Sequence, residues 1–94
     1  MKLKQENAEI IALKVLGWLA ADQELCQVFL GTSGASQEDL RSGVSDPAFL
    51  ASVLDFVMMD DAWVMRCCDM CALAYTDPMM ARQSLPGGGE VHWT

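Results

Sequence analysis

The stretch Phe49-Leu50-Ala51-Ser52-Val53-Leu54-Asp55-Phe56-Val57-Met58-Met59 contains only two polar residues, Ser52 and Asp55. These two lie three positions apart, so on a helix they share one narrow polar stripe and leave the rest of the surface apolar. Asp46-Pro47 comes just before the stretch and supplies a capping side chain and a first-turn proline. The sequence therefore predicts a helix from about 46 to 59 that is surrounded on most sides.

Start and stop signals of the same kind recur along the rest of the chain, whereas no run alternates between apolar and polar residues as a strand would. They predict five more helices: 7–21 capped by Asn7, 22–32 capped by Asp22 and stopped by Gly34, 36–43 with a Ser36/Asp39 capping box, 60–75 capped by Asp60 or Asp61, and 76–85 opened by Thr76-Asp77-Pro78. We expect an all-α fold, a compact bundle of five to six helices in a single domain. The first, fourth and fifth helices should form its centre, residues 1–85 the helical domain, and residues 86–94 a flexible C-terminal tail.

The composition is more apolar than a small domain needs. Hydrophobic residues make up 52% of the 94 residues before the seven glycines are counted, against about 45–50% for an average set that includes glycine. A chain of this size has much surface and little interior. We therefore expect a protein partner or a second copy to cover part of the surface.

Large apolar side chains are the candidates for that interaction surface. Tryptophan is common at the centres of interfaces, and adjacent methionines on a helix point about 100° apart, so a doublet cannot lie wholly on one buried face. The predicted interaction surface consists of Trp18, Met58, Met59, Trp63 and Trp93.

The net charge of −7 argues against several classes of partner. From Asp22 to Asp77, ten acidic residues stand against Arg41 and Arg66, which repels nucleic-acid backbones and anionic lipid. Leu30, Gly34, Ser36 and Leu40 have the spacing of a helix-turn-helix. The second helix, however, begins Gln37-Glu38-Asp39, with the wrong sign for phosphate. A helix-turn-helix-like nucleic-acid binder is therefore a less favoured hypothesis, and we expect no nucleic-acid partner.

The apolar segment 10–21 is twelve residues long and contains Lys14, so it is too short to span a bilayer and unlike a signal peptide. We therefore expect no membrane partner and a cytoplasmic protein, in which the four cysteines are free thiols.

Cys67-Cys68-Asp69-Met70-Cys71 is the strongest candidate for chemistry. Zinc sites usually place such pairs in turns and draw on a second pair of ligands, whereas these cysteines lie within an apolar helical pattern. Buried cysteine also behaves as a small hydrophobe, so core packing is the favoured interpretation. A thiol-based metal or redox sensor using Cys67, Cys68 and Cys71 remains the alternative.

No other group of residues suggests catalysis. Asp55, Asp60 and Asp61 form a small carboxylate cluster, but Asp60 and Asp61 stand where a helix cap is expected. His92, the only histidine, falls in the tail with no nucleophile placed beside it. The sequence predicts no catalytic residues, no metal ligands and no cofactor, and the protein is expected not to be an enzyme.

Several apolar motifs resemble one known family. They are Leu13-x-x-Leu16-Gly17-Trp18-Leu19-Ala20, Phe29-Leu30, Asp46-Pro47-x-Phe49-Leu50-x-x-Val53-Leu54-Asp55-Phe56 and Leu85-Pro86-Gly87-Gly88. The chain is similar over nearly its whole length to the domain of unknown function numbered 3572, a family of small proteins found mainly in alphaproteobacteria. The resemblance implies a stand-alone bacterial cytoplasmic protein and assigns no activity, cofactor or site. The cysteine cluster and the many methionines do not belong to that pattern.

The leading functional hypothesis is a non-enzymatic protein–protein interaction module, acting as an adaptor or as a homo-oligomer. Its basis is the apolar excess and the two nearly all-apolar helical segments, 49–59 and 62–75.

Overall fold

Side-chain caps mark the first turns of four helices in the computed structural model, which describes residues 4–85. The side chains of Asp22, Ser36, Asp46 and Asp60 each accept a hydrogen bond from a backbone N–H two or three residues further on. Ser36 and Asp39 form the full capping box, since the Asp39 carboxylate also accepts from the Ser36 N–H. These caps confirm the predicted starts of the four helices.

The described chain consists of helices and connecting turns, without a strand between residues 4 and 85. The elements are α1 (Gln5–Ala21), α2 (Gln23–Ser33), α3 (Gln37–Ser42), the 3₁₀ helix η1 (Gly43–Ser45), α4 (Pro47–Val57), α5 (Asp61–Cys71) and α6 (Asp77–Gln83). The predicted all-α fold is confirmed, and η1 is an addition that the sequence patterns did not indicate. The radius of gyration of 12.3 Å is that of one compact domain, about 12 Å at this length.

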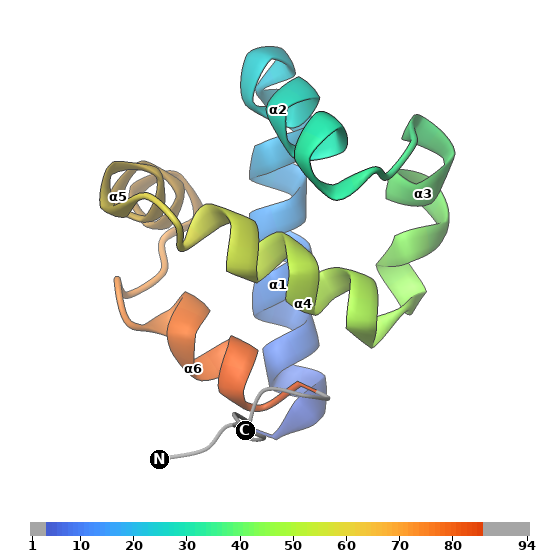
Figure 1. Cartoon of the computed structure of the whole chain (residues 1–94). Coiled ribbons are helices and arrows are strands. Elements are labelled where there is room, and N and C mark those ends of the chain that lie inside the picture. Colours follow the sequence, from blue (N-terminus) through green and yellow to red (C-terminus); the bar gives the residue numbers. More distant parts are fainter. Residues whose placement is uncertain (1–3, 86–94) are drawn as a thin grey trace, which may run out of the picture.

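Helix α1 is the element on which most of the others pack. It contacts α2, α4, α5 and α6, and α4 crosses in front of it (Figure 1). Six of the eleven residues of α4 are buried, which agrees with a helix surrounded on most sides. The core residues of these two helices are Ala8, Ala12, Val15, Leu16 and Leu19 of α1 and Leu50, Ala51, Val53, Leu54, Phe56 and Val57 of α4.

Helix α5 is less central than predicted. Only Cys67 and Cys68 of its eleven residues are buried, while Met65 and Met70 are exposed. The helix lies at one side of the molecule (Figure 1), so only one of its faces meets the core. The apolar sequence of this segment therefore does not mean that it is surrounded.

The helix α5 also ends at Cys71, four residues before the predicted end. Ala72 takes a left-handed conformation with φ of 57°, and the N–H of Leu73 donates to the carbonyl of Cys68. Glycine is the usual residue at such a position, and its absence hid the stop signal. A second correction concerns α1, which begins at Gln5 after Lys4 without a side-chain cap, so Asn7 lies inside the helix.

Helix α6 is held against α4 by a side-chain contact. The Nε of Arg82 lies 2.8 Å from Oδ1 of Asp55, which makes this a hydrogen-bonded ion pair. Asp55 therefore has a structural role. The predicted flexible tail, 86–94, lies outside the described residues.

We expect Ala72→Gly to stabilise the protein by up to about 1 kcal/mol, because glycine adopts the left-handed conformation without the steric cost of a Cβ. Thermal and urea unfolding would measure the change. Ala62→Gly, on the right-handed first turn of α5, is the matched control and should destabilise. A loss of stability in Ala72→Gly would contradict the role given to this turn.

We expect Gly43→Ala to destabilise the protein by about 1–3 kcal/mol, the range typical of overpacking. A Cβ at Gly43 would lie 2.6 Å from Cγ of the Phe49 ring, so the ring would have to move. Gly17→Ala is the control, because nothing lies within 4 Å of a Cβ there, and it should stabilise α1 by about 0.5–1 kcal/mol. Equal effects in the two variants would rule out the contact with Phe49 as the cause.

Candidate functional site

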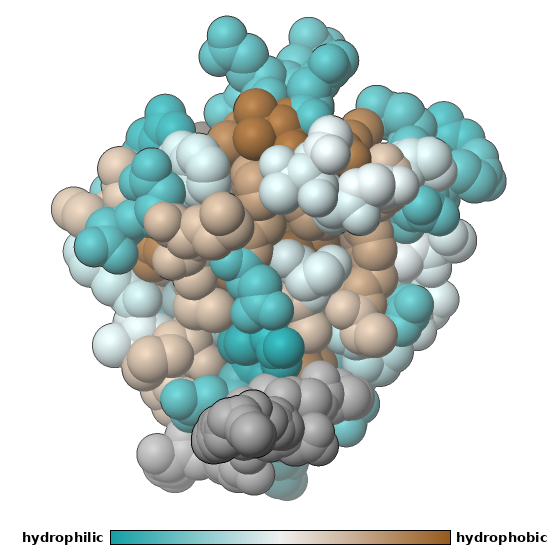
Figure 2. Space-filling model, viewed as in Figure 1, coloured by the Kyte–Doolittle hydropathy of each residue, from teal (hydrophilic) through white to brown (hydrophobic). Residues whose placement is uncertain are grey.

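Large apolar side chains reach the surface over much of the described chain. Nine of them in residues 4–85 are exposed: Ile10, Leu13, Val28, Val44, Met59, Met65, Met70, Tyr75 and Met79. Figure 2 shows a brown apolar patch just below the hydrophilic residues at the top of the molecule, in the region where α2 lies in Figure 1. The excess of apolar residues in the sequence is therefore only partly absorbed by the core.

The residues of the predicted interaction surface differ in exposure. Met59 is 70% exposed, whereas Trp18, Met58 and Trp63 are half-buried and pack against the core. Trp93 lies outside the described residues. Trp63 lines a hollow in the surface.

The hollow at Trp63 lies between α2 and α5 and has a volume of about 370 Å³. Leu25 and Val28 of α2 face Trp63 of α5 across it. The ring of Trp63 stacks on Phe56 at a centroid distance of 5.0 Å, which supports it from behind. Asp22, Glu24 and Arg66 also line this hollow, so it combines apolar walls with charged groups.

A row of four rings continues from Trp63 into the core. Phe56 meets Phe29 edge-on at 5.3 Å, and Phe29 meets Phe49 in the same way at 5.9 Å. Such edge-to-face pairs contribute about 0.5–1.5 kcal/mol beyond the area they bury. Trp63 is therefore held in place by core packing.

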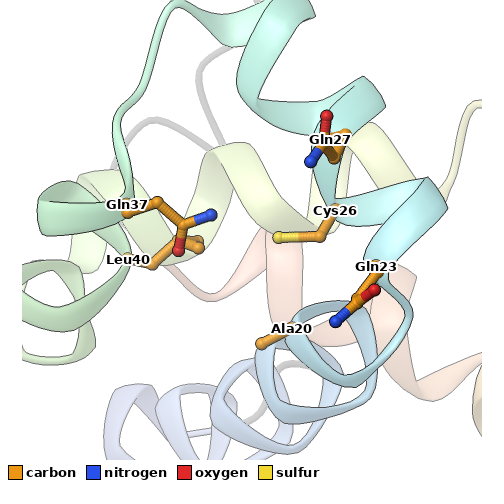
Figure 3. A pocket seen from close by; sticks show the side chains of 6 residues that line it. All are labelled: Ala20, Gln23, Cys26, Gln27, Gln37 and Leu40. Atoms are coloured by element: carbon orange, nitrogen blue, oxygen red, sulfur yellow. The ribbon is translucent and has the colours of Figure 1, made fainter.

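A second hollow, of about 330 Å³, lies on the other side of α2. Three glutamines and no charged residue line it, together with Ala20, Cys26 and Leu40. The Cys26 thiol and the Gln37 amide point into the space between α2 and α3 from opposite sides (Figure 3). The other two glutamines are Gln23 and Gln27 of α2.

The two hollows each share lining residues with a third one on the outer face of α2. A shallow depression there is lined by Gln23, Glu24 and Gln27. It shares Gln23 and Gln27 with the amide-lined hollow and Glu24 with the hollow at Trp63. We call these three neighbouring hollows the α2 track. Sequence reasoning did not find it, although Gln23 and Gln27, four apart, mark a polar face of α2.

The cysteine cluster is mostly inside the protein. Cys67 and Cys68 are fully buried, and Cys71 is half-buried with its thiol directed at the carbonyl of Lys14. Burial raises the pKa of the Cys67 thiol to about 12, with the neighbouring Cys71 and Cys68 thiols acting in the same direction. Burial also raises the pKa of Cys68, and Asp77 adds to that shift. Because the thiolate is the reactive form, these shifts disfavour reaction at neutral pH.

Among residues 4–85, no three histidine, cysteine or acidic side chains come close enough to hold a metal ion. Two carboxylates of the cluster noted in the sequence have different structural roles. Asp60 caps α5, and Asp55 forms an ion pair with Arg82. His92 lies outside the described residues.

The turn between α2 and α3 has the geometry expected from its sequence. Gly34 takes a left-handed conformation with φ of 75°, and Ser36 caps α3. The first turn of α3 carries Glu38 and Asp39, so a nucleic-acid backbone would meet two negative charges there.

A scan against family models matches residues 5–88 to the family described as "Protein of unknown function (DUF3572)". The chain belongs to this family. The match confirms the resemblance drawn from the apolar motifs. No curated protein and no solved structure gave a match. Within residues 4–85, no helix of this DUF3572 protein is long and apolar enough to cross a membrane.

We expect Cys67 and Cys68 of the native DUF3572 protein to react with Ellman's reagent at pH 7.5 more than ten-fold more slowly than after unfolding. Their burial and raised pKa keep them protonated and inaccessible. Cys71, the most exposed of the four thiols, should react first. Cys71→Ser removes this fastest phase and serves as the assignment control. Rapid labelling of all four thiols in the folded protein would contradict this.

Proposed function

We propose that the protein is a non-enzymatic interaction module that binds another protein or a second copy of itself in the cytoplasm. The observation that carries the proposal is the exposure of nine large apolar side chains in residues 4–85, one of which, Val28, lines a hollow together with Leu25 and Trp63. An apolar hollow that is open to solvent favours an interaction site.

The methionines outside the core support this function. Met59 is 70% exposed and Met70 is 77% exposed. Each square ångström of apolar surface removed from water contributes roughly 25 cal/mol, so covering such side chains favours association. Methionine also adapts its shape to a partner because its side chain is unbranched and polarizable.

The negative charge of the chain indicates which class of partner it would bind. A net charge of −7 favours basic protein surfaces and disfavours nucleic acid and anionic membranes. An adaptor for a basic protein satisfies both the charge and the apolar exposure.

The thiol-based sensor finds less support. The raised pKa of Cys67 and Cys68 and their complete burial oppose redox reactivity, and residues 4–85 offer no three-ligand metal cluster. No observation favours it over the interaction module.

We expect light scattering to show a mass above the 10.3 kDa of a single chain that falls on dilution, or affinity capture from the source cell to retain a specific partner. Met70→Lys should weaken that association at least ten-fold, because it places a charge in an apolar contact. Gln83→Lys, an equally charged change at an exposed polar position of α6, is the control and should leave the association unchanged.

A monomer at every concentration that captures no partner would overturn the proposed function. An equal loss in the Met70 and Gln83 variants would show that net charge rather than apolar contact governs the association.

A further inference from the structure

The outer face of α2 presents three different chemistries in succession. Gln23 and Gln27 lie toward α3, Glu24 lies between the hollows, and Val28 lies toward Trp63 of α5. All four α2 residues are exposed, so a ligand can reach them without the helix moving. The order amide, acid, apolar is what a segment of protein chain with mixed side chains would match.

We propose that the α2 track binds an extended segment of a partner protein, one that carries a basic side chain next to an apolar one. This inference rests on the proposed function and specifies the partner of the interaction module.

The apolar side chain of the segment fits the hollow between α2 and α5. Val28 is half exposed there and Trp63 half-buried, so both would gain burial when the hollow is filled. Trp63 is held by its stack on Phe56, which makes the wall rigid and reduces the ordering cost of binding.

The basic side chain fits the acidic part of the track. Asp22 and Glu24 line the same hollow as Val28 and Trp63. The one ion pair within residues 4–85 joins Arg82 to Asp55, so neither acid of the track forms an ion pair with Arg66, which lines the same hollow. A lysine or arginine of the partner would supply the missing positive charge, with the strength of a charge-assisted hydrogen bond.

The backbone of the segment fits the amide-lined hollow. A glutamine amide both donates and accepts hydrogen bonds, as do the N–H and C=O groups of an extended chain. The side chains of Gln23, Gln27 and Gln37 form no hydrogen bond within the described part of the chain. No charged side chain lines this hollow, which agrees with a neutral peptide backbone as its occupant.

Panning a phage-displayed library of random twelve-residue peptides on the full-length protein tests the proposal. We expect the enriched peptides to place lysine or arginine beside an aliphatic or aromatic residue. Fluorescence polarisation of the best labelled peptide then measures its affinity for four variants, each checked by circular dichroism for folding.

The variants form two matched pairs. Glu24→Lys removes the acid of the track, and Glu38→Lys makes the same charge change at the same position in the first turn of α3. Val28→Lys charges the apolar hollow, and Met79→Lys does the same at a side chain of similar exposure on α6. We expect Glu24→Lys and Val28→Lys to weaken binding at least ten-fold, and the two controls to change it less than two-fold.

Failure of this proposal can be told apart from failure of the proposed function. An equal loss of affinity in both members of each pair of variants would contradict peptide binding at the α2 track. Enrichment of acidic peptides would also contradict it. Neither result would contradict the proposed interaction module. Absence of any enriched peptide would also overturn the track. If the wild-type protein is in addition a strict monomer that captures no partner, the proposed function is contradicted as well.

Discussion

The packing of α4 across α1 is the contact on which the rest of the molecule depends. Alanines on the buried face of α1, Ala8 and Ala12, leave room for the neighbouring helices to approach, and the branched residues of α4 fill the space between them. Close packing of this kind is sensitive to single methylene groups. Once these two helices bury each other, α2, α5 and α6 each need to contribute only one face to the core.

Because α2, α5 and α6 each bury only one face, the chain is rich in apolar residues and still exposes many of them. A small domain cannot surround more than one or two helices completely. In this protein α4 is the helix that is surrounded on most sides. Helix α5 also contains several large apolar residues, but it carries Asp61, Arg66 and Asp69 as well and lies at the side, so Met65 and Met70 face outward. Position in the fold, rather than apolarity alone, decides which of these residues are available to a partner.

The sequence predicted most helix starts because capping is local chemistry: Asp22, Ser36, Asp46 and Asp60 each act within three residues. It missed the end of α5 because Ala72 adopts a left-handed backbone conformation, which is unusual for alanine and cannot be recognised from the residue type. It identified Trp63 by size, but not Val28 or Gln37, because the hollows form between helices that are distant in the sequence. The predicted surface residues Trp18 and Met58 are half-buried, since their exposure depends on neighbours that no local pattern reveals.

The row of four rings has a consequence for how the protein can diverge among its relatives. Phe49 fits against Gly43 at the η1 corner, and Phe29 and Phe56 connect it, ring by ring, to Trp63 at the hollow. Each ring sets the position of the next, so a substitution at the η1 corner affects the hollow, and a substitution at the hollow affects the corner. Compensating substitutions at the two ends are therefore expected to co-occur in homologues, and the covariation of Gly43 with Trp63 would trace a contact path through the core.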